Sequence, residues 1–183
     1  MQIPVKGIER KQIFDTLETY RADDLKWREG RAFGLIFDAG PEVMAVGKEA
    51  YNAFLTENGM DFSAFQSLTR IENELVAMTA AHLRGDNQVV GNFTSGGTES
   101  IILAVKTARD FFRQKRPDIK VPEMILPTSA HAAFHKAAHY LGIKVVAASV
   151  NPSTFRADVD SIRQAITANT IMLVGSAPSY AHG

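Results

Sequence analysis

The chain has 183 residues, no cysteine, and 20 basic against 20 acidic residues. This composition excludes disulfide scaffolds, cysteine-based zinc sites and thiol nucleophiles. The balanced charge argues against a nucleic-acid binder, which concentrates Lys and Arg against phosphates. No apolar run approaches the length of a membrane span and the N-terminus lacks a signal-peptide profile, so we expect a cytoplasmic protein with no integral membrane segment.

The first part of the chain has helical periodicity. The apolar residues that mark the faces of three predicted helices are Ile13, Leu17 and Tyr20, then Val43, Val46, Ala50 and Phe54, then Leu68, Ile71, Leu75 and Met78. The second helix is predicted to begin at Pro41 and to stop at Asn58 and Gly59, and the third to end at Gly85. We assign residues 1–86 to a helical N-terminal segment.

The pattern changes near residue 87, where short apolar runs begin to alternate with amphipathic helices. The predicted strands cover residues 88–93, 124–126, 144–149 and 170–175. The predicted helices between them cover residues 99–116, 134–141 and 159–168. This alternation is typical of βαβ units. Residues 87–183 are therefore predicted to form an α/β domain with a largely parallel sheet and flanking helices.

Three unusual polar segments follow predicted strands, at residues 94–100, 128–131 and 176–183. Ligands of open α/β sheets bind at the carboxyl ends of the strands. Because the strands are predicted to be parallel, the three segments should meet at one edge of the sheet. That edge is where we expect the functional site.

The sequence from Ser95 to Thr98 has two adjacent glycines at the start of a predicted helix. Glycines let backbone amides approach a ligand closely, and a helix N-terminus favours a phosphate dianion. Thr98 and Ser100 would add hydroxyl donors. The alternative is an ordinary turn capped by Ser or Thr. The segment is neither a Walker loop nor a dinucleotide fingerprint, and its residues alone leave both interpretations open.

His131, His135 and His139 are four residues apart and would share one helical face. Such a row can hold zinc, but Ala132 stands where catalytic zinc motifs carry a glutamate, so we expect no metal site. We interpret His135 and His139 as packing or surface residues. His131 lies at a strand-to-helix junction, where its flat ring could stack on a planar cofactor.

Tyr180 and His182 lie beside Pro178, just beyond the last predicted strand. A phenol and an imidazole at the ligand edge could transfer protons. The alternative is that both are surface residues without a chemical role. Tyr180 is therefore a candidate catalytic residue only.

Residues 91–101, Gly-Asn-Phe-Thr-Ser-Gly-Gly-Thr-Glu-Ser-Ile, resemble the phosphate-binding stretch of the group II pyridoxal-phosphate decarboxylases, which include glutamate decarboxylase. Segments 27–31, 65–73, 129–138 and 176–183 also resemble the family, in its order and with its spacings. Within this family the soluble bacterial type of sphingosine-1-phosphate lyase is the most similar. The resemblance covers nearly the whole chain.

The resemblance implies a fold-type I enzyme that uses pyridoxal 5'-phosphate and works as a homodimer, with active sites at the subunit interface. It implies that Gly97 and Thr98, with Gly96 beside them, hold the cofactor phosphate and that His131 stacks on the pyridine ring. It also implies that Tyr180 lies near the cofactor. The implied reaction is retro-aldol cleavage of a phosphorylated sphingoid base to phosphoethanolamine and a long-chain aldehyde.

Asn58 and Asp61 match a family loop that reaches a neighbouring subunit's site, which implies a role in substrate binding. Two positions depart from the family pattern. Asp61 stands where many relatives have histidine, and its charge would repel a phosphorylated substrate unless it is paired. Phe37 stands about where some members have an active-site tyrosine.

In this family the Schiff-base lysine and the aspartate that pairs with the pyridine nitrogen follow the segment that ends here at Gly183. We therefore expect that the chain stops partway through the large domain and is inactive alone. Three alternatives remain open: a group II amino-acid decarboxylase, a non-catalytic truncated homologue that only binds or dimerises, and a phosphate-binding α/β module unrelated to this cofactor.

Overall fold

The computed structural model describes residues 3–179 and 182, except residues 33 and 35. The chain divides into two compact units, Met1–Thr56 and Glu57–Gly183, and each is described here by itself. This division falls before the change of sequence pattern near residue 87, because the third helix is grouped with the α/β part. The boundary between residues 86 and 87 stays a prediction.

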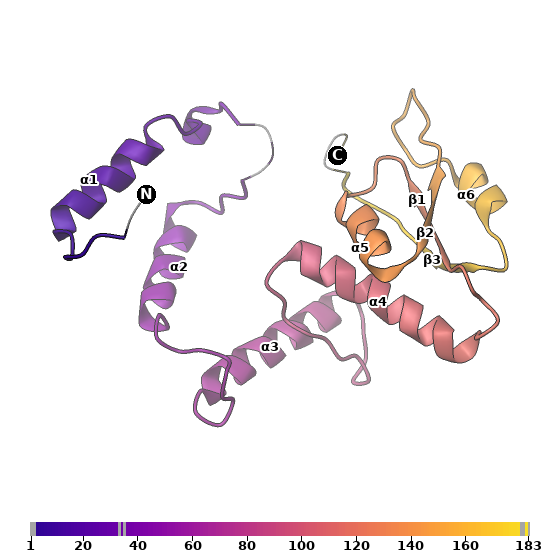
Figure 1. The fold of residues 1–183 in the computed structure, drawn as a ribbon, viewed down its shortest axis with the longest axis horizontal. Coiled ribbons are helices and arrows are strands. Elements are labelled where there is room, and N and C mark those ends of the chain that lie inside the picture. The colour runs from indigo at the N-terminus through magenta and orange to yellow at the C-terminus, as the bar shows by residue number, and fades with distance from the viewer. Residues whose placement is uncertain (1–2, 33, 35, 180–181, 183) are drawn as a thin grey trace. The chain divides into compact units, whose positions relative to one another are not determined.

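Among its described residues, the first unit contains two α-helices and one short 3-10 turn, which Figure 1 shows. They are α1 (Arg10–Arg21), η1 (Trp27–Glu29) and α2 (Pro41–Ala53). Both α-helices were predicted, but α2 ends five residues before Asn58. The chain leaves the helix at Phe54, with φ −109° and ψ 18°, and Asn58 belongs to a separate turn, in which its side chain accepts a hydrogen bond from the Met60 N–H at 3.1 Å.

The second unit holds a three-stranded sheet and four helices among its described residues. The elements are α3 (Gln66–His82), α4 (Gly97–Lys115), β1 (Glu123–Pro127), α5 (Ala133–Leu141), β2 (Lys144–Ala148), α6 (Val159–Ala165) and β3 (Thr170–Leu173). The strand order is β2-β1-β3, and both pairings are parallel. All five residues of the central strand β1 are buried. The predicted α/β arrangement with a parallel sheet is confirmed.

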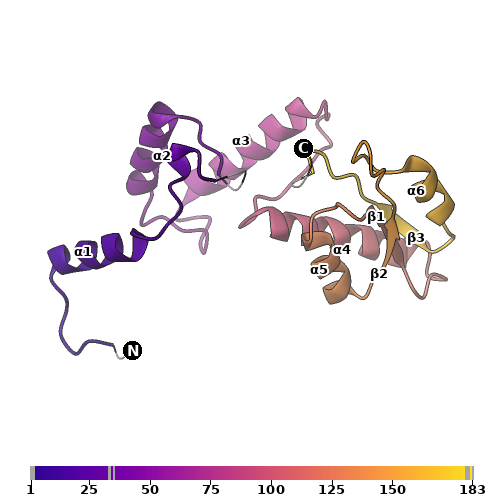
Figure 2. The same ribbon diagram turned by 90° about the horizontal axis from the view of Figure 1, so that it is seen from above.

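The two crossovers of the sheet run to opposite sides of β1. The chain goes from β1 through α5 to β2, and then from β2 through α6 to β3. Right-handed crossovers in opposite directions place their helices on opposite faces, and Figure 2 shows α5 and α6 on the two sides of the sheet. Helix α4 packs against α5 and β3. One face is therefore covered by α4 and α5, and the other by α6.

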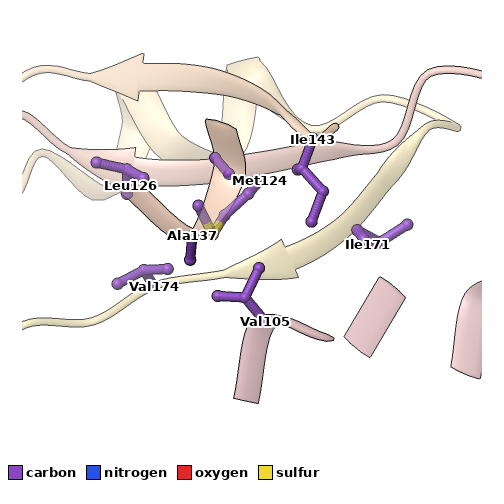
Figure 3. Close-up of a cluster of buried hydrophobic side chains, with 8 residues drawn as sticks. Val105, Met124, Leu126, Ala137, Ile143, Ile171 and Val174 are labelled. Carbon is purple, nitrogen blue, oxygen red and sulfur yellow. The ribbon is translucent and has the colours of Figure 1, made fainter. Parts of the chain in front are cut away.

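The core lies between the sheet and the α4–α5 face. Its buried residues are Val105, Met124, Leu126, Ala137, Ala138, Ile143, Ile171 and Val174. Figure 3 shows Val105 of α4 and Ala137 of α5 among the side chains of the strands. The small side chains of Ala137 and Ala138, at most 1% exposed, let α5 approach the sheet closely. This packing fixes the positions of the strand ends.

Residues 88–93 are not a strand, and that prediction was wrong. The segment instead runs irregularly against α3, where a side chain at Gly91 would meet Val76 at 3.0 Å. Val89 and Val90 remain 46% and 90% exposed. A short apolar run forms a strand only where another strand accepts its backbone hydrogen bonds, and no described strand pairs with this segment.

Helix α6 is shorter than predicted and ends at Ala165. The Thr167 N–H donates to the Thr170 hydroxyl at 2.9 Å and the Asn169 N–H to the Thr167 hydroxyl at 3.0 Å, so these threonines form a turn in place of further helix. Throughout the described residues, every helix is too short or too polar to cross a membrane.

Candidate functional site

The carboxyl ends of the strands and the N-terminus of α4 lie at the same end of the second unit. Helix α4 ends at Lys115, and a short connection leads to the start of β1 at Glu123. The helix therefore runs back along the sheet, with its N-terminus toward the end where β1 and β3 finish (Figure 1). Residues 94–100 and the segment after β1 thus lie toward the same end of the sheet (Figure 1), while the third predicted segment, residues 176–183, falls partly outside the described residues.

The first turn of α4 presents three backbone donors without acceptors. The first helical hydrogen bond runs from the Ser100 N–H to the Gly96 carbonyl at 3.1 Å. Among the described residues, no acceptor is paired with the N–H groups of Gly97, Thr98 and Glu99. The N-cap residue is Gly96, which provides no side-chain cap. These donors and the positive end of the helix dipole are suited to an anion.

The two glycines of this turn border open space. A Cβ atom built on Gly96 or Gly97 would meet no atom within 4 Å. Gly96 is extended, with φ 161°, and Gly97 is helical, so neither backbone conformation requires glycine. Packing within the described chain does not require it either. Close approach of a ligand to the backbone is the remaining physical reason for glycine here.

The hydroxyl groups of Thr94, Ser95 and Ser100 are engaged in other hydrogen bonds and do not cap the helix. The Ser95 hydroxyl and N–H both donate to Glu99 Oε2, at 2.6 and 2.7 Å. The Thr94 hydroxyl donates to the Gly96 carbonyl at 3.1 Å and lies 2.7 Å from Ser100 Oγ. Because Thr94 has a single hydroxyl proton, Ser100 donates in the latter contact. The ordinary Ser or Thr cap considered from the sequence is absent from this described segment.

Among the described α-helices, only α6 has an N-cap residue whose side chain caps the helix. The Asp158 carboxylate accepts from the N–H groups of Asp160 and Ser161, at 2.9 and 3.1 Å. Helix α4 has no such cap, because its first-turn acid, Glu99, accepts hydrogen bonds from Ser95 and not from the amides of the helix. Since the N-cap residues of α1, α2, α3 and α5 also provide no side-chain cap, the glycine pair and the open space beside it, and not the missing cap alone, set the α4 turn apart.

His131 lies between β1 and α5, at the predicted edge. Its Nδ1 accepts a hydrogen bond from the Ala133 N–H at 3.1 Å. An accepting Nδ1 carries no proton, so the neutral ring has its proton on Nε2. The ring is thus oriented by the backbone while the residue stays exposed. His135 and His139 are exposed on α5, and no group of three metal-ligating side chains gathers within the described residues.

The segment after β3 is tied to the loop after β2. The rings of His182 and Phe155 stack at 4.5 Å with an interplanar angle of 18°. Phe155 has φ +56°, a left-handed conformation, and Asn151 closes its loop by accepting from Ser153 and Thr154. Sequence reasoning missed Phe155, although the Asn-Pro-Ser turn before it was a visible signal.

Tyr180, the candidate catalytic residue, lies outside the described residues. Its neighbour Ser179 is buried, with a hydroxyl that has no partner among the described residues. The predicted role of Tyr180 therefore stays a prediction.

The substrate loop predicted at Asn58 and Asp61 forms turns before α3. The Asp61 carboxylate accepts from the Ser63 hydroxyl and N–H, at 2.6 and 2.8 Å, and from the Ala64 N–H at 3.3 Å. The Ser63 bonds are the main reason that the pKa of Asp61 is lowered. No hydrogen bond or ion pair recorded for the described residues joins this loop to residues 94–100. Phe37 is fully exposed in the first unit.

Comparison with known proteins gives one family and several relatives. The profile of the DegT/DnrJ/EryC1/StrS aminotransferase family matches residues 72–177. Sphingosine-1-phosphate lyase of Oryza sativa subsp. japonica is 44% identical over 100% of this chain and 34% of its own length. Sphingosine-1-phosphate lyase 1 of Rattus norvegicus is 39% identical, over 99% of this chain and 31% of its own length.

A probable L-aspartate decarboxylase of Pyrococcus furiosus is 34% identical, over 97% of this chain and 45% of its own length. The chain spans about a third of the length of the curated lyases that it matches.

Solved structures agree with these relatives. The sphingosine-1-phosphate lyase of Burkholderia pseudomallei K96243 superposes with a TM-score of 0.86 at 38% identity, over 98% of this chain and 43% of that one. Glutamate decarboxylase of Lactobacillus brevis gives a TM-score of 0.79 at 19% identity, over 96% of this chain and 41% of that one. The predicted fold class and the resemblance stated from the sequence are both confirmed.

Proposed function

This chain belongs to the DegT/DnrJ/EryC1/StrS aminotransferase family, and from that premise we propose that it is part of a pyridoxal-phosphate-dependent lyase that cleaves a phosphorylated sphingoid base. The observation that carries the proposal is the first turn of α4, with its uncapped amides and its two glycines bordering open space. The substrate class is supported by relatives named sphingosine-1-phosphate lyase at 33–44% identity.

The donor set of the first α4 turn fits the phosphate of this cofactor. The N–H groups of Gly97 and Thr98 would hold phosphate oxygens, with Gly96 leaving room and the Thr98 hydroxyl as a further donor. His131, oriented through Nδ1, would present a ring face to the pyridine ring. When bound, the cofactor supplies the electron sink for carbon–carbon cleavage. The residues of this chain would bind and orient it.

By the family resemblance, the lysine that holds the cofactor covalently would lie outside these 183 residues, and this chain alone would then be inactive. Three lysines of the α/β part are engaged elsewhere. Lys106 pairs with Asp110 at 2.7 Å and Lys144 with Glu123 at 2.8 Å. Lys136 lies over the Tyr140 ring.

Binding of the substrate would involve Asn58 and Asp61. Hydrogen bonds within its own turn hold the Asp61 carboxylate in place and favour its ionised form, so a phosphorylated substrate would have to bind with its phosphate away from this side chain. The complete protein would work as a homodimer, as the family resemblance implies, and the cytoplasmic location expected from the sequence is kept as part of the proposal. Tyr180 remains the candidate for proton transfer.

The proposal is tested on the complete protein in two steps. Titration with pyridoxal phosphate should produce the visible absorbance of the protein-bound cofactor, and Thr98→Val should weaken binding. Thr107→Val is the matched control, because its hydroxyl donates to the Leu103 carbonyl within α4, away from the first turn. A phosphorylated sphingoid base should then be cleaved to phosphoethanolamine and an aldehyde.

Release of CO₂ from an amino acid, without sphingoid-base cleavage, would assign the protein to the decarboxylases instead. Absence of cofactor binding by the folded protein would overturn both assignments.

A further inference from the structure

Glu99 makes the least ordinary contact at the N-terminus of α4. It is the third residue of the helix, and one of its carboxylate oxygens accepts both donors of Ser95: the hydroxyl at 2.6 Å and the N–H at 2.7 Å. Two donors from one residue on a single oxygen fix the direction of the chain as it enters the two glycines. The contact runs from inside the helix back to the residue before its N-cap.

A second bridge reinforces the first across the same glycines. The Thr94 hydroxyl donates to the Gly96 carbonyl at 3.1 Å, and Ser100 Oγ lies 2.7 Å from Thr94 Oγ1. Adjacent glycines have the widest conformational freedom of any residue pair, and ordering them costs entropy. The two bridges hold the glycine turn in place through side-chain hydrogen bonds. The backbone N–H groups of the turn therefore remain free to bind a ligand.

The Glu99 carboxylate is ionised and accepts its hydrogen bonds from Ser95. The hydroxyl of Ser95, and then its N–H, lowers the pKa of the Glu99 carboxyl, so the group is ionised at neutral pH. An acid in the first helical turn also stabilises the helix through its dipole. If Glu99 only stabilised the helix, removing it would leave phosphate binding unaffected. If its negative charge only repelled the phosphate, removing it would strengthen phosphate binding.

We propose that Glu99 is a positioning residue for the cofactor phosphate: by holding Ser95 it keeps the amides of Gly97 and Thr98 open and correctly directed. The inference rests on the proposed function, because it assigns Glu99 a role at the proposed phosphate site. Glu99 itself does not touch the phosphate. Its contribution is to orient the turn before the ligand arrives, which lowers the entropic cost of binding.

The experiment compares Glu99→Ala, Glu99→Gln and Asp158→Ala in the complete apoprotein. Asp158→Ala is the matched control, because Asp158 is also an acid at a helix N-terminus and caps α6. For each variant the dissociation constants of pyridoxal phosphate and of pyridoxal are measured by absorbance or fluorescence titration, together with the thermal midpoint. The ratio of the two constants isolates the contribution of the phosphate group.

Glu99→Ala is expected to weaken pyridoxal phosphate binding roughly tenfold, the effect of losing one well-formed hydrogen-bonded contact, with little change for pyridoxal. Glu99→Gln should restore most of the affinity, because its amide oxygen still accepts from Ser95. Asp158→Ala should lower the thermal midpoint and leave the ratio unchanged. If Glu99→Ala fails to fold, Ser95→Ala removes the shorter of the two bonds and should shift the ratio in the same direction.

Equal or tighter pyridoxal phosphate binding by both Glu99 variants would overturn the inference. Tighter binding would mean that the carboxylate repels the phosphate. A wild-type protein that binds neither ligand would instead refute the proposed function, and the inference with it.

Discussion

The substitution Gly97→Ala separates stability from ligand binding at the first turn of α4. Gly97 is the first helical residue, and an added Cβ would meet no atom within 4 Å. Alanine loses less backbone entropy than glycine in a helix, by about 0.5–1 kcal/mol. The free energy of unfolding of the apoprotein should therefore rise by that amount, measured by urea denaturation with linear extrapolation.

The same methyl group would stand in the space that a phosphate needs, so the affinity for pyridoxal phosphate should fall by about tenfold or more. Gly47→Ala in α2 is the matched control, because Gly47 is also helical with nothing near its added Cβ. It should stabilise the protein similarly without changing cofactor affinity. A lower free energy of unfolding for Gly97→Ala would show that other protein atoms already fill the space beside Gly97. Unchanged affinity would show that no phosphate approaches there.

Substitutions at three further positions test the interactions that hold the α/β part together. Leu126→Ala removes a side chain with 0% exposure from β1 and should lower the free energy of unfolding by about 2–5 kcal/mol in a denaturation experiment. Lys144 and Thr167 hold the pKa of the buried Glu123 below its ordinary value of 4.5. These contacts therefore stabilise the folded protein fully above pH 4.5, and their contribution is lost as the pH falls through the lowered pKa. The stability deficit of Lys144→Met should therefore be largest above pH 4.5 and shrink in acid, and a deficit independent of pH would contradict this. Phe155→Gly should be more stable than Phe155→Ala by about 1 kcal/mol in thermal denaturation, because only glycine adopts φ +56° without strain; the reverse order would show that the strain is absent.

The elements that sequence reasoning located best are those whose signals are local. Pro41 at the start of α2 and Gly142, with φ +65° after α5, mark helix ends by backbone chemistry alone. β1 was found because a strand covered on both faces has an uninterrupted apolar sequence. Residues 88–93 have a similar apolar character, but their conformation depends on a partner strand, and a sequence pattern does not specify the partner.

In the candidate site, too, the features with local signals were found from the sequence and the others were not. The glycine pair and the following helix were visible in the sequence, and so was His131 at the end of a strand. The role of Glu99 was not visible, because Thr94 and Ser95 are as suitable for capping as for bridging, and only the backbone path decides which occurs. The stack of Phe155 on His182 joins two loops far apart in the sequence, so no local pattern could predict it.

The central claim is that the first turn of α4 binds the phosphate of pyridoxal phosphate, and a crystal structure of the complete protein with that cofactor tests it most directly. We predict phosphate oxygens about 2.7–3.2 Å from the amide nitrogens of Gly97 and Thr98, with the His131 ring against the pyridine ring. A cofactor bound with its phosphate away from these amides would contradict the claim.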